Sequence, residues 1–129
     1  MSPLTPVEDA FFKCSNFEEA EKLTTSCINP EAMVGVHNSQ GIYIKLSPSS
    51  KAFIGYTESE LINQSPYDFF HPDDFQKILK SHAEVTVTKE VSRVAYSFLK
   101  KDGSYKQVAT LSKTLKDKNA VEFILTFTF

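Results

Sequence analysis

Five segments of the chain have the residue pattern of β-strands, and hydrophobic and polar residues alternate most clearly in the second and the last of them. A period of two is typical of a strand with one buried face. The five segments are residues 33–38, 42–46, 91–99, 105–115 and 121–129. Turn-forming sequences at residues 38–41, 101–104 and 116–119 would join neighbouring strands. In the last segment, Phe123, Leu125 and Phe127 fall on one side, so that strand has one strongly apolar face.

Several short helices are expected between the second and third strands, because residues typical of helix starts recur there. The candidate caps are Ser47, Thr57 with Glu60, Ser65 and His71, and three of them precede a proline. Gly55 would provide a left-handed stop for the first helix. The last cap begins the longest predicted helix, residues 72–85. Its buried stripe would contain Phe75, Ile78, Leu79 and His82, at helical spacing.

Two short amphipathic helices are predicted within residues 1–30. Capping boxes at Thr5 to Glu8 and at Ser15 to Glu18 would start them. Their apolar stripes must be covered, either by the sheet of the same domain or by a second chain or signal-carrying partner. The shortness of both helices and the tight turn near residues 14–16 favour a helical cap packed on the chain's own sheet.

The order of strands, helices and strands predicts an α+β fold with helices on one face of an antiparallel sheet. The run YIKLSPSSKAFIGYTESELINQSPYDFFHPDD, residues 43–74, also resembles the signature of PAS domains. That signature has a strand ending in Ser-Pro, then an aliphatic-Gly-Tyr, a Thr-x-x-Glu-Leu and a His-Pro-Asp-Asp. The sequence KKDGSY at residues 100–105 resembles the hairpin of later strands in the family. The resemblance covers residues 31–129 and leaves residues 1–30 as the helical cap or flank.

The resemblance implies a five-stranded sheet with short helices and one longer helix on one face, enclosing a pocket. With Val108 inward, as in the family, Thr110 and Ser112 would also point inward, and Leu111 would face the N-terminal helices. Buried hydroxyls need partners, so we expect water or a polar ligand inside. The expected pocket residues are Phe69, Ile78, Leu79, His82, Tyr96, Thr110 and Ser112.

Haem and non-covalent flavin are the cofactors to weigh. Haem-binding PAS domains ligate iron through a histidine on the long helix, where this chain has His82, although a core-edge histidine is the simpler interpretation. The flavin–thiol adduct of light-sensing relatives is excluded, because residues 63–67 contain no cysteine. His71 is interpreted as a local cap and His37 as exposed or packed at the sheet edge. No metal site is expected.

Composition limits the remaining classes. The 129 residues are 41% hydrophobic, which suits one core, and a net charge of -2 gives no reason to expect nucleic acid or an anionic membrane as partner. Cys14 and Cys27 are interpreted as ordinary thiols of a reducing compartment. With no apolar run of bilayer length and no signal peptide, we expect a cytoplasmic protein without membrane contact.

The resemblance implies a regulatory sensor module of a larger signalling protein, such as a histidine kinase of a two-component system or a diguanylate cyclase. It would bind a small molecule or a partner and pass its state to a covalently linked effector domain through flanking helices or homodimerisation. The alternative is a ligand-free interaction and dimerisation module of a transcription regulator. An enzyme would need a buried carboxylate or tyrosine dyad, and Tyr96 is the one inward candidate, so we expect no catalysis.

Overall fold

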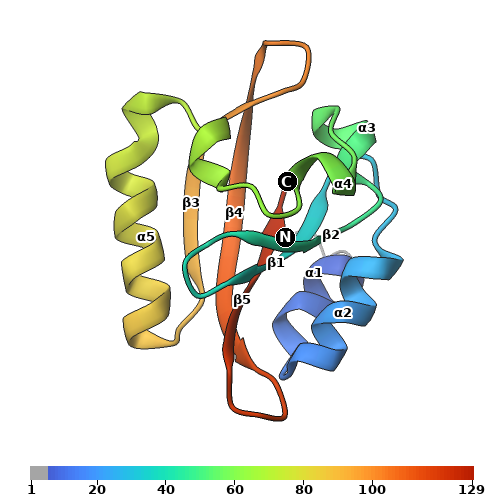
Figure 1. The fold of residues 1–129 in the computed structure, drawn as a ribbon, viewed down its shortest axis with the longest axis vertical. Helices are drawn as coiled ribbons and strands as arrows, with labels where there is room; N and C mark the ends of the chain where they lie inside the picture. Colours follow the sequence, from blue (N-terminus) through green and yellow to red (C-terminus); the bar gives the residue numbers. More distant parts are fainter. Residues whose placement is uncertain (1–5) are drawn as a thin grey trace, which may run out of the picture.

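An antiparallel sheet with helices on both faces organises the chain (Figure 1). The computed structural model describes residues 6–129, and within them five strands pair in the order β2-β1-β5-β4-β3. The strands are β1 (Met33–Asn38), β2 (Tyr43–Leu46), β3 (Ser92–Leu99), β4 (Tyr105–Lys116) and β5 (Glu122–Thr128). The first and last strands pair at the centre of the sheet, which confirms the predicted α+β architecture.

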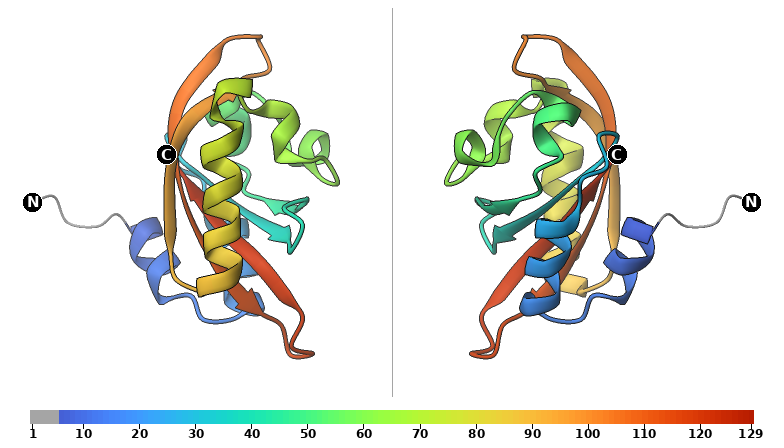
Figure 2. Two further views of the ribbon diagram at one scale, coloured as in Figure 1. Left: turned by 90° about the vertical axis from the view of Figure 1, so that its left-hand side faces the viewer. Right: turned by 90° about the vertical axis from the view of Figure 1, so that its right-hand side faces the viewer.

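The helices fall into two groups on opposite faces of the sheet (Figure 2). The helices are α1 (Pro6–Lys13), α2 (Phe17–Ser26), α3 (Ser50–Ile54), α4 (Glu58–Leu61) and α5 (Phe75–Thr88), with 3-10 turns η1 (Pro66–Phe69) and η2 (Pro72–Asp74) before α5. We call the face covered by α1 and α2 the outer face and the face covered by α3 to α5 the inner face. The longest helix therefore lies across the sheet from the N-terminal pair.

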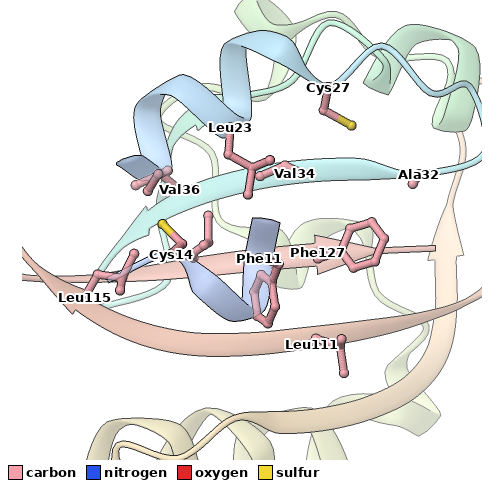
Figure 3. Packing of buried hydrophobic residues seen from close by; sticks show 12 residues of the cluster. Phe11, Cys14, Leu23, Cys27, Ala32, Val34, Val36, Leu111, Leu115 and Phe127 are labelled. Carbon is pink, nitrogen blue, oxygen red and sulfur yellow. The ribbon is translucent and has the colours of Figure 1, made fainter. Parts of the chain in front are cut away.

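The outer face has its own hydrophobic core (Figure 3). Its buried members are Phe11, Cys14, Ala20, Leu23, Cys27, Ala32, Val34, Val36, Leu111, Leu115, Leu125 and Phe127. The apolar side of β5 thus packs against the N-terminal helices and not against α5. Both cysteines are free and buried within this core. The helices α1 and α2 pack on the chain's own sheet, as the shortness of both predicts.

Lys113 on β4 holds the end of α1 against the outer face. Its ammonium group donates hydrogen bonds to the carbonyl oxygens of Phe11 and Phe12, at 2.9 and 3.2 Å. The Nζ atom also lies 5.4 Å from the centroid of the Phe11 ring. The last carbonyls of a helix lack partners within the helix, and a cation there is favoured by the helix dipole. Burial lowers the pKa of Lys113 from its usual value.

The inner face has a second core, which contains Met33, Tyr43, Leu46, Phe53, Ile54, Leu61, Ile78, Tyr96, Phe98 and Val108. Val108 therefore lies on the inner face and Leu111 on the outer one, as expected. Aromatic rings carry much of this core: Phe70 contacts Tyr96 edge-on at 4.9 Å between centroids, and Phe69 stacks on Phe98 at 5.9 Å.

The predicted caps meet different outcomes along the series of short helices. Thr57 and Glu60 form the predicted capping box. The side chains of Ser65 and His71 accept hydrogen bonds at the starts of η1 and η2. Gly55 is left-handed, with a φ of 89°, as predicted for the end of α3. The prediction for Ser47 is wrong. Its hydroxyl is fully buried and accepts from the backbone N–H of Val34 at 3.0 Å. Ser47 therefore ties this region to β1 instead of capping α3.

The cap of α2 is Asn16 and not Ser15, because the Asn16 side chain accepts from the backbone N–H of Glu19 at 2.9 Å. The hydroxyl of Ser15 instead donates to the Glu19 carboxylate at 2.7 Å. The predicted cap at Thr5 lies outside the described residues. The cap of α2 therefore lies one residue later than predicted, and the apolar stripe of the helix is unchanged.

Both edge strands are partly covered by other segments. On β3, the Asp74 carboxylate accepts from the backbone N–H of Ser97 at 2.8 Å, and the N–H of His71 donates to the Ser97 carbonyl at 3.1 Å. On β2, the backbone of Tyr43 exchanges hydrogen bonds with Gln64 and Asn63, at 3.3 and 2.9 Å. Backbone groups that would otherwise be open to another strand are therefore occupied at these positions.

We expect Lys113→Met to loosen α1 and to lower the free energy of unfolding by about 1–2 kcal/mol, because the α1 carbonyls lose a charged donor. Amide hydrogen exchange should accelerate in α1 and much less in α5. Lys118→Met, at an exposed position of the turn before β5, is the matched control and should leave both unchanged. Equal exchange rates in α1 of wild type and Lys113→Met would contradict this docking role.

Candidate ligand cavity

A partly open cavity of about 80 Å³ lies on the inner face, between the sheet, η1 and α5. Strands contribute His37, Tyr43, Val94, Tyr96, Thr110, Ser112, Ile124, Thr126 and Thr128, while Gly41, Pro66, Tyr67, Phe70, Ile78, Ser81, His82 and Val85 complete the lining. Every strand of the sheet thus reaches the cavity. Its walls mix aliphatic and aromatic groups with hydroxyls and imidazoles, and no Asp, Glu, Lys or Arg of the described chain lines it.

Five of the seven predicted pocket residues line this cavity: Ile78, His82, Tyr96, Thr110 and Ser112. Leu79 and Phe69 are not among the lining residues. Leu79 is 50% exposed, because the buried stripe of α5 runs through Ile78, Ser81 and Val85. Phe69 lies outside the cavity, where its ring packs on Phe98 and Tyr56.

His37 is the principal residue that sequence reasoning missed. The expectation of an exposed or edge histidine is wrong, since its side chain is 5% exposed. Nδ1 lies 3.0 Å from the Gly41 carbonyl oxygen, and Nε2 lies 2.8 Å from the Thr126 hydroxyl. A carbonyl only accepts, so Nδ1 carries the proton and donates, and neutral Nε2 accepts from Thr126. Strand alternation from Val34 and Val36 could have placed His37 on the inner face.

Burial keeps His37 neutral. Desolvation is the main cause that lowers its pKa to about 4, His82 nearby adds to this, and the hydrogen bond to Gly41 opposes it. Gly35 makes room for the pair formed by His37 and Thr126. A Cβ at position 35 would lie 3.0 Å from the Thr126 hydroxyl and 3.2 Å from Nε2 of His37.

Three hydroxyls form a connected line across the inner face. The Tyr96 hydroxyl lies 2.7 Å from Thr110 Oγ1, which lies 2.8 Å from Thr128 Oγ1. The hydroxyls predicted to point inward from β4 are therefore present, and that of Thr110 bonds to other side chains of the protein. Burial raises the pKa of Tyr96 to about 12, although the hydrogen bonds from Thr110 and Thr128 act in the opposite direction. Each of these groups is uncharged at neutral pH.

The hydroxyl of Tyr67 stands apart from this network. Its oxygen atom is buried, and it has no hydrogen-bond partner among the described residues. Ring contacts with Phe70 and Phe75, at 5.3 and 5.9 Å between centroids, hold the Tyr67 side chain in place beside the cavity. A buried hydroxyl without a partner costs stability, so this group has unused capacity to donate a hydrogen bond.

His82 lies at the rim of the cavity and bridges α5 to the turn between β1 and β2. Nε2 of His82 lies 3.1 Å from the Ser39 carbonyl oxygen, so this nitrogen carries a proton and is not free to ligate iron. Sites for drug-sized ligands begin near ~300 Å³, and the cavity of about 80 Å³ is far smaller.

A second hollow, of about 190 Å³, adjoins the cavity at His82 and Ile124. The ion pair of Lys89 with Glu122 links the end of α5 to β5 beside it, at 2.6 Å.

Among residues 6–129, no helix combines the length and apolar character needed to cross a bilayer. The same residues contain no group of three or more side chains suited to hold a metal ion.

An antiparallel sheet in the order 2-1-5-4-3, with short helices and one long helix beside a small cavity, places the chain in a class of small α+β domains. The family model described as the PAS fold matches residues 43–127. The chain belongs to the PAS family. Domains of this family are regulatory modules.

Known proteins similar to the chain come from several kinds of signalling system. Basic helix-loop-helix ARNT-like protein 1 of Homo sapiens is 32% identical over 73 residues, which are 56% of this chain but 12% of that protein. Cycle PAS-B of Drosophila melanogaster with bound ethylene glycol has a TM-score of 0.70 at 23% identity, covering 75% of this chain and 97% of that one. A domain of a sensor histidine kinase/response regulator from Geobacter sulfurreducens reaches 0.66 at 19%, with 86% and 90% covered.

The buried neutral His37 should make stability depend on pH. Its folded pKa, about 4, lies below the ordinary value of 6.5, so its contribution is complete above pH 6.5 and is lost as the pH falls through about 4. We expect wild type to lose up to about 1.4 kcal/mol per pH unit between pH 6 and 5. His37→Gln should remove this slope, measured by urea unfolding, whereas His71→Gln should retain it. A slope unchanged in His37→Gln would contradict the assignment.

Tyr67→Phe should stabilise the ligand-free protein by about 1 kcal/mol, because it removes a buried hydroxyl that has no partner. The matched control is Tyr96→Phe, which removes a hydroxyl bonded to Thr110 and should destabilise by about 1 kcal/mol. Unfolding midpoints in urea measure both changes. Destabilisation by Tyr67→Phe of the same size as by Tyr96→Phe would show that the Tyr67 hydroxyl has a partner.

Proposed function

We propose that the chain is a sensor domain that binds a small molecule in the inner-face cavity and relays occupancy to an effector domain. The observation that carries this proposal is the cavity itself, which is lined by polar groups from every strand and from α5. A domain used only as a structural spacer has no need for buried hydroxyls and a buried imidazole, because apolar side chains would fill the same space at lower cost.

Strands that place one residue in the cavity and the next in the outer core support a route for the relay from the cavity to the N-terminal helices. On β4, Thr110 faces the cavity and the next residue, Leu111, packs in the outer core. On β5, Thr126 faces the cavity and Phe127 packs in the outer core. A ligand that shifts either strand therefore also moves side chains that contact α1 and α2. The mechanism is a population shift between two packings of the N-terminal helices on the outer face.

PAS domains occur in sensor kinases, in diguanylate cyclases and in basic helix-loop-helix transcription factors. A second candidate function is therefore a dimerisation module of a transcription regulator. Two aromatic side chains at the outer face favour it: Phe12 is 45% exposed and Phe129 is 40% exposed. In this alternative the cavity has no ligand, and the outer face pairs with a second chain.

A cavity-filling variant separates the two functions. Val94 lines the cavity, whereas Ala95, the next residue of β3, is exposed on the other side of the strand. We expect fragments that bind wild type in saturation-transfer NMR to lose binding at least tenfold in Val94→Phe and to bind Ala95→Phe normally. Circular dichroism and sedimentation velocity would verify that each variant keeps its fold and its oligomeric state.

Equal fragment binding by Val94→Phe and Ala95→Phe would overturn the sensor proposal, because the ligands would then lie outside the cavity. A wild-type protein that binds no fragment while sedimenting as a dimer would also overturn it, and would support the dimerisation module. Loss of binding in Val94→Phe alone supports the sensor function.

A further inference from the structure

The groups around the cavity differ in how much hydrogen-bonding capacity remains for a ligand. His37 uses both ring nitrogens, on Gly41 and Thr126. The hydroxyl of Thr110 has contacts on two sides, with Tyr96 and Thr128. The Ser81 hydroxyl lies 2.7 Å from that of Ser92. These groups are committed to one another.

Other groups of the lining keep capacity for a ligand, namely the hydroxyls of Tyr43 and Ser112, Nδ1 of His82 and the hydroxyl of Tyr67, and that of Tyr67 is the most deeply buried of them. Its buried hydroxyl oxygen has no partner in the described chain, and its ring is held by Phe70 and Phe75. A phenolic hydroxyl donates one hydrogen bond at little entropic cost when its ring is already fixed. An acceptor from outside the chain would take this hydrogen bond once the side chains around the buried oxygen move to open it to the cavity.

Charge sets a second limit on the ligand. The described cavity lining contains no Asp, Glu, Lys or Arg, so an ionic ligand would be buried there without a counter-charge. Taking an unpaired charge out of water is far more costly than burying a hydrogen-bonded neutral group. A cavity of about 80 Å³ is well below the size of sites for drug-sized ligands, so it suits a molecule of only a few heavy atoms.

We propose that the cavity selects a small uncharged molecule with a carbonyl, ether or hydroxyl oxygen, and that the Tyr67 hydroxyl donates a hydrogen bond to this oxygen. This inference rests on the proposed sensor function and adds the class of ligand and the residue that recognises it. The aliphatic walls formed by Ile78, Val85 and Val94 contact the carbon part of the molecule.

The test uses three probes of one planar shape and equal number of heavy atoms: acetone, acetate and acetamidinium. Each is titrated into the ¹⁵N-labelled full chain at pH 7 and constant ionic strength, and shifts are followed at cavity residues. We expect acetone to bind at least tenfold more tightly than either ion. Tyr67→Phe should weaken acetone about tenfold, as for the loss of one hydrogen bond. Tyr105→Phe, at a tyrosine that is 46% exposed, should have no effect.

Xenon separates failure of this inference from failure of the sensor function. Xenon binds cavities without hydrogen bonds, and its ¹²⁹Xe shift should report occupancy in wild type and in Tyr67→Phe alike. If xenon and acetone both leave the cavity resonances unchanged, no accessible cavity exists and the sensor function fails with the inference. If xenon enters but acetate binds as well as acetone, or Tyr67→Phe binds acetone normally, the ligand class is wrong and the sensor function stands.

Discussion

The alternation of side chains across the central strands is the constraint on which the structure depends. Because successive residues of a strand point to opposite faces, β4 and β5 build an apolar core on one side and a polar-lined cavity on the other. A slip of one residue would exchange the two sets and bury hydroxyls under the N-terminal helices. The apolar side of β5, which includes Leu125 and Phe127, fixes this register against α1 and α2.

Much of the fold could be predicted from local patterns, because strand alternation and helix caps are short-range features. All five strands fall within about two residues of their expected bounds. The errors arise where distant segments decide. Ser47 bonds to Val34, thirteen residues away, instead of to its own helix. His37 is buried on the inner face, where its ring bonds to Gly41 and to Thr126 of β5.

The candidate site was predictable to the extent that it lies on regular elements. Tyr96, Thr110 and Ser112 follow from strand alternation once one inward residue is known, and Ile78 follows from helix periodicity. Leu79 fails because two adjacent residues of a helix point about 100° apart, so a stripe through Ile78 leaves one neighbour outside. Tyr67 could not be found from its sequence context, since only the packed structure shows that its hydroxyl lacks a partner.

The covered edges of the sheet have a consequence for how the domain associates with other proteins. Asp74 occupies one backbone group of β3, and the segment before η1 occupies those of β2. Strand-by-strand extension between copies, the route by which open sheets grow into fibrils, is thereby discouraged at both rims. A second copy that added a strand at Ser97 or at Tyr43 would first have to displace these groups.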